Sequence, residues 1–151
     1  MKLTVASSPH IRGNFRTNRI MLDVVLALLP ALIVGIWRFG VRALMVTLVS
    51  IVCAVAAEWL YSLVTRTRHT VVDGSAVVTG LLLAMTLPHT VPYWQAAIGS
   101  VFAIVLVKGL CGGLGQNIFN PALAGRALLM LIAPAGITRY AGLDGITAAT
   151  P

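Results

Sequence analysis

The sequence has few charged residues, and acidic residues are the scarcest of them. Charged residues make up 10% of the 151-residue chain, which contains only four aspartates and glutamates. A soluble domain carries about 25% charged residues, so this shortage excludes an ordinary soluble globular protein. Hydrophobic residues make up 58% of the chain, and the mean hydropathy is +0.93. This composition is that of an integral membrane protein.

The motifs of several common enzyme and cofactor classes are also missing. The two cysteines, Cys53 and Cys111, do not have Cys-x-x-Cys spacing, so the sequence indicates no zinc or iron–sulfur site. The glycines at 113 and 115 lack the third glycine of a dinucleotide-binding fingerprint, and no Gly-Lys-Ser/Thr follows them. No Ser-His-Asp or Cys-His arrangement indicates a catalytic site. The basic residues lie between apolar segments rather than in one solvated patch, which argues against nucleic-acid binding.

Five apolar segments alternate with short polar ones, and they predict an all-α membrane protein. We expect helices at about 20–37, 43–64, 75–87, 94–110 and 121–133. The third and fifth end at prolines and are shorter than the roughly 20 residues that span a bilayer. Short, proline-bounded helices among longer spans are typical of discontinuous-helix bundles, which usually form one half of an inverted repeat. We find no second half in the sequence, so we expect the N-terminal half of a longer chain.

The distribution of basic residues predicts the orientation and three regions. If all five segments cross the membrane, the side of the N-terminus holds seven basic residues and the opposite side three. The positive-inside rule then makes residues 1–19 a cytoplasmic basic segment. Residues 20–134 form the transmembrane domain of a multi-pass protein of the bacterial inner membrane, and 135–151 form a periplasmic tail. The seven residues are Lys2, Arg12, Arg16, Arg19, Arg66, Arg68 and Lys108.

Glu58 lies inside the second span. An acidic residue within a membrane span is a candidate functional residue, here for an ion pathway. Because Glu58 is only about two turns from the end of the span, it could instead reach the interface or pair with Arg66 or Arg68. The sequence leaves both interpretations open.

A polar, glycine-rich stretch at 111–126 interrupts the apolar segments. Backbone that is neither helix nor closed barrel at membrane depth must be buried in protein or line a cavity. Within the stretch, Asn120 and Pro121 predict a helix start, because asparagine caps helices and proline suits the first helical position. The short helix that they open would direct its positive N-terminal end inward, toward an anionic or carbonyl-bearing ligand.

The same stretch resembles a known family. Its Gly-Gly-Leu-Gly-Gln-Asn-x-Phe-Asn-Pro-Ala run, from residue 112, is similar to the signature of the D subunit of the Rnf ion-translocating electron-transport complex. It is also close to the B subunit of the sodium-pumping NADH:quinone reductase. The resemblance extends to Ala6–His10 and Asp73–Ala84 and covers essentially the whole chain. It implies a membrane flavoprotein that works with a periplasmic flavoprotein subunit and other membrane subunits, and that couples electron transfer to Na⁺ or H⁺ translocation.

The resemblance also implies the flavin sites. In the family, Asp-x-x-Ser/Thr-Gly-Ala-Thr marks the threonine to which a flavin transferase joins FMN as a phosphoester. Here Asp144, Thr147, Ala149 and Thr150 match, while Ala148 replaces the glycine. Thr150 is therefore the expected covalent FMN site.

Further flavin contacts and a rival function stay open. Asn117 and Asn120 are expected flavin contacts, by analogy with a non-covalent riboflavin in the related reductase subunit, although Asn120 also suits a helix cap. Arg126 could pair with a flavin, with Glu58 or with a phosphate of the membrane lipid. The alternative function is a urea-channel-like channel without redox activity, because broken helices around a polar stretch suit either function.

Overall fold

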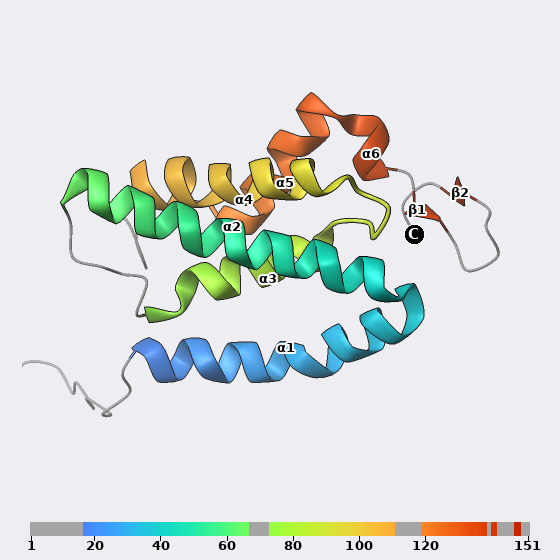
Figure 1. The fold of residues 1–151 in the computed structure, drawn as a ribbon, viewed down its shortest axis with the longest axis horizontal. Coiled ribbons are helices and arrows are strands. Elements are labelled where there is room, and N and C mark those ends of the chain that lie inside the picture. Colours follow the sequence, from blue (N-terminus) through green and yellow to red (C-terminus); the bar gives the residue numbers. More distant parts are fainter. Residues whose placement is uncertain (1–16, 67–72, 111–118, 139, 142–146, 149–151) are drawn as a thin grey trace, which may run out of the picture.

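The structure is a computed structural model that describes residues 17–66, 73–110, 119–138, 140–141 and 147–148. These residues are almost entirely helical (Figure 1). The elements are α1 (Thr17–Phe39), α2 (Val41–Thr65), α3 (Ser75–Thr86), α4 (Tyr93–Phe102) with its π-helical continuation η2 (Ala103–Leu110), α5 (Pro121–Ile132), α6 (Pro134–Thr138), β1 (Tyr140–Ala141) and β2 (Thr147–Ala148). The two strands form one short antiparallel pair.

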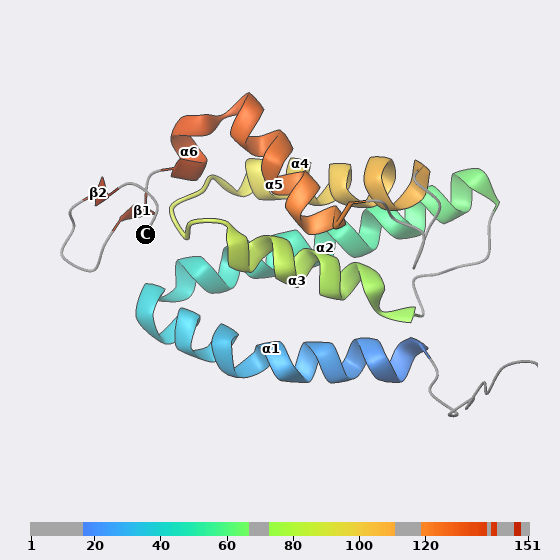
Figure 2. The same cartoon turned by 180° about the vertical axis from the view of Figure 1, so that it is seen from behind.

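The helices form a bundle in which α2 is central and α1 lies at one edge. Figures 1 and 2 show α3 and α4 packed along α2, with α5 on their far side. The α1–α2 turn, the α3–α4 connection, α6 and the two strands all lie at one end of the bundle. This end is opposite to the one where α1 begins, so we name it the distal end.

Local chemistry explains where the helices stop and start. The side-chain Oδ1 of Asn120 accepts a hydrogen bond from the Ala122 N–H at 3.0 Å, and Pro121 occupies the first turn of α5. This cap confirms the predicted helix start. At the end of α3, Leu87 is extended before Pro88, as the residue before a proline prefers to be. Between α1 and α2 only Gly40 interrupts the helix, with a φ of 74° that suits glycine.

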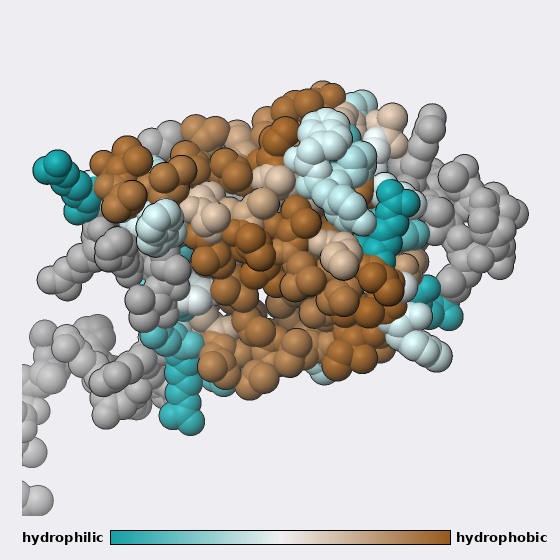
Figure 3. Space-filling model, in the orientation of Figure 1, coloured by the Kyte–Doolittle hydropathy of each residue, from teal (hydrophilic) through white to brown (hydrophobic). Residues whose placement is uncertain are grey.

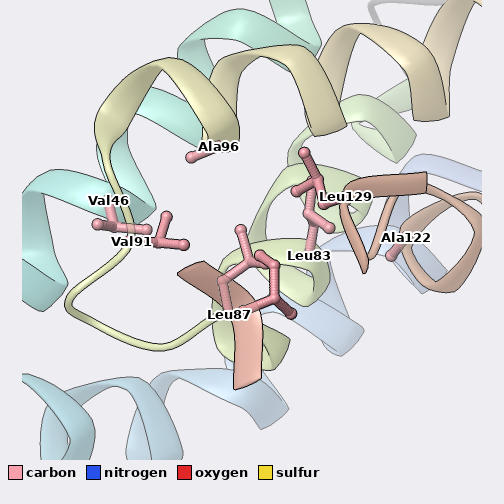
Figure 4. Packing of buried hydrophobic residues seen from close by; sticks show 8 residues of the cluster. Val46, Leu83, Leu87, Val91, Ala96, Ala122 and Leu129 are labelled. Atoms are coloured by element: carbon pink, nitrogen blue, oxygen red, sulfur yellow. The ribbon is translucent and has the colours of Figure 1, made fainter. Parts of the chain in front are cut away.

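The apolar core lies between α2, α3, α4 and α5. Figure 4 shows seven labelled side chains of this core, which converge from these helices and from the α3–α4 connection. By contrast, α1 has no buried side chain along its whole length. The residues of this cluster are Val46, Leu83, Leu87, Val91, Ala96, Ala122, Leu129 and Ile137, and a second, smaller cluster consists of Ala54, Ala57, Ala76 and Ile104.

The outer surface of the bundle is apolar. Figure 3 shows a broad hydrophobic band over the helices, with hydrophilic residues toward the two ends. Many large hydrophobic side chains point outward, including Trp37 (81% exposed) and Leu131 (84% exposed). Both α1 and α2 are long and apolar enough to cross a bilayer. The fold is thus that of an all-helical membrane protein, as predicted, and the short α3 and α5 are its discontinuous helices.

Candidate functional site

A buried charged cluster joins three helices. Lys108 on η2, Glu58 on α2 and Ser75 at the start of α3 are 6%, 3% and 4% exposed, respectively. The Nζ of Lys108 forms an ion pair with Oε1 of Glu58 and donates a hydrogen bond to Oγ of Ser75 at 2.5 Å. The cluster therefore connects the central helix α2 to η2 and to the start of α3.

The π-helix places Lys108 in this cluster. A π-helical stretch is uncommon and is often found at functional sites. Here it is held against α2 by Tyr61, whose hydroxyl donates to the carbonyl oxygen of Gly109 at 3.0 Å. A Cβ at Gly109 would lie 2.7 Å from the Tyr61 ring, so glycine allows this close approach.

The cluster bears on two sequence-based interpretations. The count of basic residues places Lys108 on the cytoplasmic side; Lys108 is buried inside the bundle, and its side of the membrane stays a prediction. The sequence also allows Glu58 to reach the interface, but its side chain is buried and forms an ion pair with Lys108, a partner that the sequence pattern did not suggest. A signal was nevertheless present, because a lysine and a glutamate within apolar segments need each other to offset the cost of burial. Without Lys108, the side of the N-terminus still holds more basic residues than the opposite side.

The start of α5 is a second candidate site. Asn120 is exposed, and its Oδ1 is engaged in the helix cap, so its amide NH₂ is the group that would face a ligand carbonyl. The N-terminal end of α5 adds the positive end of the helix dipole. Arg126 lies about one and a half turns further along α5 and is half-buried. Asn117 lies outside the described residues.

Replacing Asn120 with alanine should destabilise the protein by about 1 kcal/mol, because the first turn of α5 loses its side-chain acceptor. Denaturation in detergent, followed by circular dichroism, would measure the loss. Asn120→Asp keeps the acceptor and should change stability by only a few tenths of a kcal/mol. Equal losses in both variants would show that the cap is not the cause.

The predicted FMN-attachment tail is only partly described. β1 and β2 pair Tyr140 with Ala148 and Ala141 with Thr147, and they lie at the distal end. Asp144, Ala149 and Thr150 lie outside the described residues. Among the residues described, no three histidine, cysteine or acidic side chains form a cluster that could hold a metal.

The sequence matches one protein family over residues 4–151. The chain belongs to the NQR2, RnfD, RnfE family. It is 47% identical, over its whole length, to an Acetobacterium woodii protein named as the D subunit of a Na(+)-translocating ferredoxin:NAD(+) oxidoreductase complex. It is 46% identical, over 98% of its length, to the D subunit of the proton-translocating complex of Clostridium ljungdahlii. The D subunit of an Escherichia fergusonii ion-translocating oxidoreductase complex is 38% identical over the whole chain.

The chain covers less than half of each of these relatives. Its match accounts for 48%, 46% and 44% of the three proteins, respectively. The comparison therefore establishes the family. The activity of the whole protein is a proposal.

Proposed function

We propose that this protein acts as a membrane subunit of an ion-translocating ferredoxin:NAD⁺ oxidoreductase complex of the Rnf type. The similarity to the D subunits of such complexes over nearly the whole chain carries this proposal. The all-helical membrane fold agrees with it. The other subunits of the complex, including its periplasmic flavoprotein, are the proposed partners.

We also propose that Thr150 carries FMN, attached by a flavin transferase through a phosphoester to its hydroxyl. The match of Asp144, Thr147, Ala149 and Thr150 to the attachment pattern supports this assignment. The flavin would supply the redox chemistry, and the protein would bind and orient it. At the start of α5, Asn120 offers an NH₂ donor and the helix offers a positive end, which suit a carbonyl of a flavin or riboflavin.

The proposed orientation agrees with this assignment. With the N-terminus in the cytoplasm, the distal end, which includes β1 and β2, faces the periplasm. The tail that contains Thr150 would then be accessible to a periplasmic transferase. The location in the bacterial inner membrane is part of the same proposal.

Covalent flavin can be tested directly. Protein made in a host with an active flavin transferase should show flavin fluorescence on a denaturing gel, and Thr150→Ala should abolish it because the acceptor hydroxyl is lost. Thr138→Ala is the matched control, because Thr138 also lies near the C-terminus but its hydroxyl donates to the carbonyl oxygen of Pro134 at 2.8 Å within α6. It should keep the fluorescence. A non-fluorescent wild type would contradict the FMN assignment and favour the channel alternative.

The ion-coupling part of the proposal rests on the buried cluster. A carboxylate and an ammonium group at membrane depth are uncommon and are often found on ion or proton pathways. The Glu58–Lys108 pair is therefore the proposed element of this chain that responds to a translocated Na⁺ or H⁺. A purely structural role for the pair is the competing explanation, and a variant that removes both charges separates the two.

A further inference from the structure

An apolar cavity lies between α1, α2 and the end of α3, toward the distal end. It has a volume of about 170 Å³ and opens to the outside of the bundle. Apolar cavities of about 150 Å³ take up molecules of the size of benzene, so this one can hold a segment of hydrocarbon chain. Its walls include Leu32 and Ile36 of α1, Val46 of α2, and Met85 of α3.

The cavity exists because α1 packs loosely at this point. No side chain of α1 is buried, although α2 and α3 both contribute to the core. Gly35 also lines the cavity, and a Cβ built on it would meet nothing within 4 Å. The wall is thus formed partly by the absence of a side chain at Gly35.

Two arginines are next in sequence to residues that line the cavity, because Arg38 precedes Phe39 and Arg42 precedes Ala43. His89 and Phe39 line it and stack with their ring centroids 4.7 Å apart. The pKa of His89 is lowered, first by burial and then by the positive charge of Arg42. Arg38, in the last turn of α1, and Arg42 are both exposed.

No acidic group balances these charges among the described residues of the distal end. Of the acids that the structure describes, Glu58 is paired with Lys108, and Asp73 flanks the start of α3, at the opposite end. Asp23 lies in the N-terminal half of α1. The charged residues next to the mouth of the cavity are therefore basic, while its walls are mostly apolar.

We propose that this cavity is a binding site for an anionic phospholipid. One acyl chain occupies the apolar cavity beside Gly35, and the phosphate lies near Arg38 and Arg42. Arginine binds phosphate through several hydrogen bonds, so Arg38 and Arg42 suit the headgroup. The apolar walls of the cavity suit the hydrocarbon of the acyl chain. The lipid would fill the gap that α1 leaves against α2 and α3.

Fluorescence quenching by brominated lipid tests the proposal. Phe39 lines the cavity, so Phe39→Trp reports on lipid at this site once Trp37→Phe, Trp59→Phe and Trp94→Phe remove the native tryptophans. The protein is placed in phosphatidylcholine vesicles that contain increasing fractions of brominated phosphatidylglycerol or, in parallel, brominated phosphatidylcholine. We expect phosphatidylglycerol to quench at lower mole fractions, by about fivefold for each arginine at low salt.

Three variants test whether the preference for phosphatidylglycerol depends on the cavity or on a general attraction of anionic lipid to the protein. Gly35→Leu fills the cavity without a clash of its Cβ and should remove the preference for phosphatidylglycerol. Ala27→Leu adds the same side chain to an exposed position on α1 outside the cavity and should leave the preference unchanged. Arg38→Gln/Arg42→Gln should also remove the preference. Circular dichroism would check that each variant is folded.

Several results would overturn the proposal. Equal quenching by the two lipids would show that there is no anionic site, and an unchanged preference in Gly35→Leu would show that the cavity is not part of it. Competition by free glycerol phosphate at millimolar concentration would indicate a headgroup site without an acyl chain. If the protein were a dimer that Gly35→Leu converted to a monomer, a second copy rather than lipid would fill the cavity.

Discussion

Replacing Lys108 with methionine is expected to destabilise the protein by about 3–5 kcal/mol, because Glu58 is then buried without its ammonium partner. Methionine keeps most of the length of the side chain, so the loss of charge rather than of volume dominates. The hydrogen bond to Ser75 is lost as well. The loss would be measured as a shift of the unfolding midpoint in a sodium dodecyl sulfate titration followed by far-ultraviolet circular dichroism.

A double variant tests whether the two charges act together. Glu58→Gln/Lys108→Met removes both charges and should recover most of the lost stability, since a buried ion pair replaced by neutral groups of similar size is often close to neutral. Arg19→Met is the control, because Arg19 is an exposed cation of α1, and it should change stability by less than about 0.5 kcal/mol. Glu58→Gln alone completes the cycle, and if the losses of the two single variants simply add in the double variant, the pair is not energetically coupled.

The same double variant separates a structural role from a role in ion coupling. In the assembled complex it should keep its fold and its flavin fluorescence. If Glu58 and Lys108 respond to the translocated ion, Na⁺ or H⁺ uptake by membrane vesicles should be lost while electron transfer continues. Retention of ion uptake would show that the pair only holds η2 against α2 and α3.

Features set by neighbouring residues were predictable from the sequence. Pro88 ends the third helix and Asn120-Pro121 begins the fifth, as predicted, because capping and proline geometry act within a few residues. The apolar composition and segment lengths likewise indicated a helical membrane protein. These rules needed no knowledge of which helices pack together.

Features set by tertiary packing were not predictable in the same way. Glu58 and Lys108 are 50 residues apart, and only the packing of η2 on α2 shows that they pair. The sequence predicts the fourth segment as one regular helix, but its last eight residues form a π-helix, held by Tyr61 and Gly109. Neither the cavity at Gly35 nor its basic mouth has a local sequence signal. The flavin contacts of the two asparagines and the covalent flavin site in the tail stay predictions.

Replacing Gly80 with valine should have the largest effect on helix packing, with a loss of about 3 kcal/mol or more. Gly80 of α3 lies directly against the backbone of α2, and a Cβ there would be 2.8 Å from Cα of Ile51 and 2.9 Å from the carbonyl oxygen of Ser50. Backbone atoms cannot rotate away as a side chain would, so α2 and α3 must separate. Such overpacking typically costs about 1–3 kcal/mol for a small added group, which is the loss expected for Gly80→Ala. A sodium dodecyl sulfate titration followed by circular dichroism would measure both variants.

Gly35→Ala is the matched comparison, because Gly35 is also inside a helix but faces open space. Alanine there should stabilise the protein by about 0.5–1 kcal/mol, since it reduces the backbone entropy that glycine loses on folding. Replacing glycine with alanine is thus expected to raise stability at position 35 and to lower it at position 80. If both alanine variants were stabilising, α2 and α3 would not be packed as closely at Gly80 as the structure shows. If both were destabilising, the space beside Gly35 would already be occupied by another part of the protein.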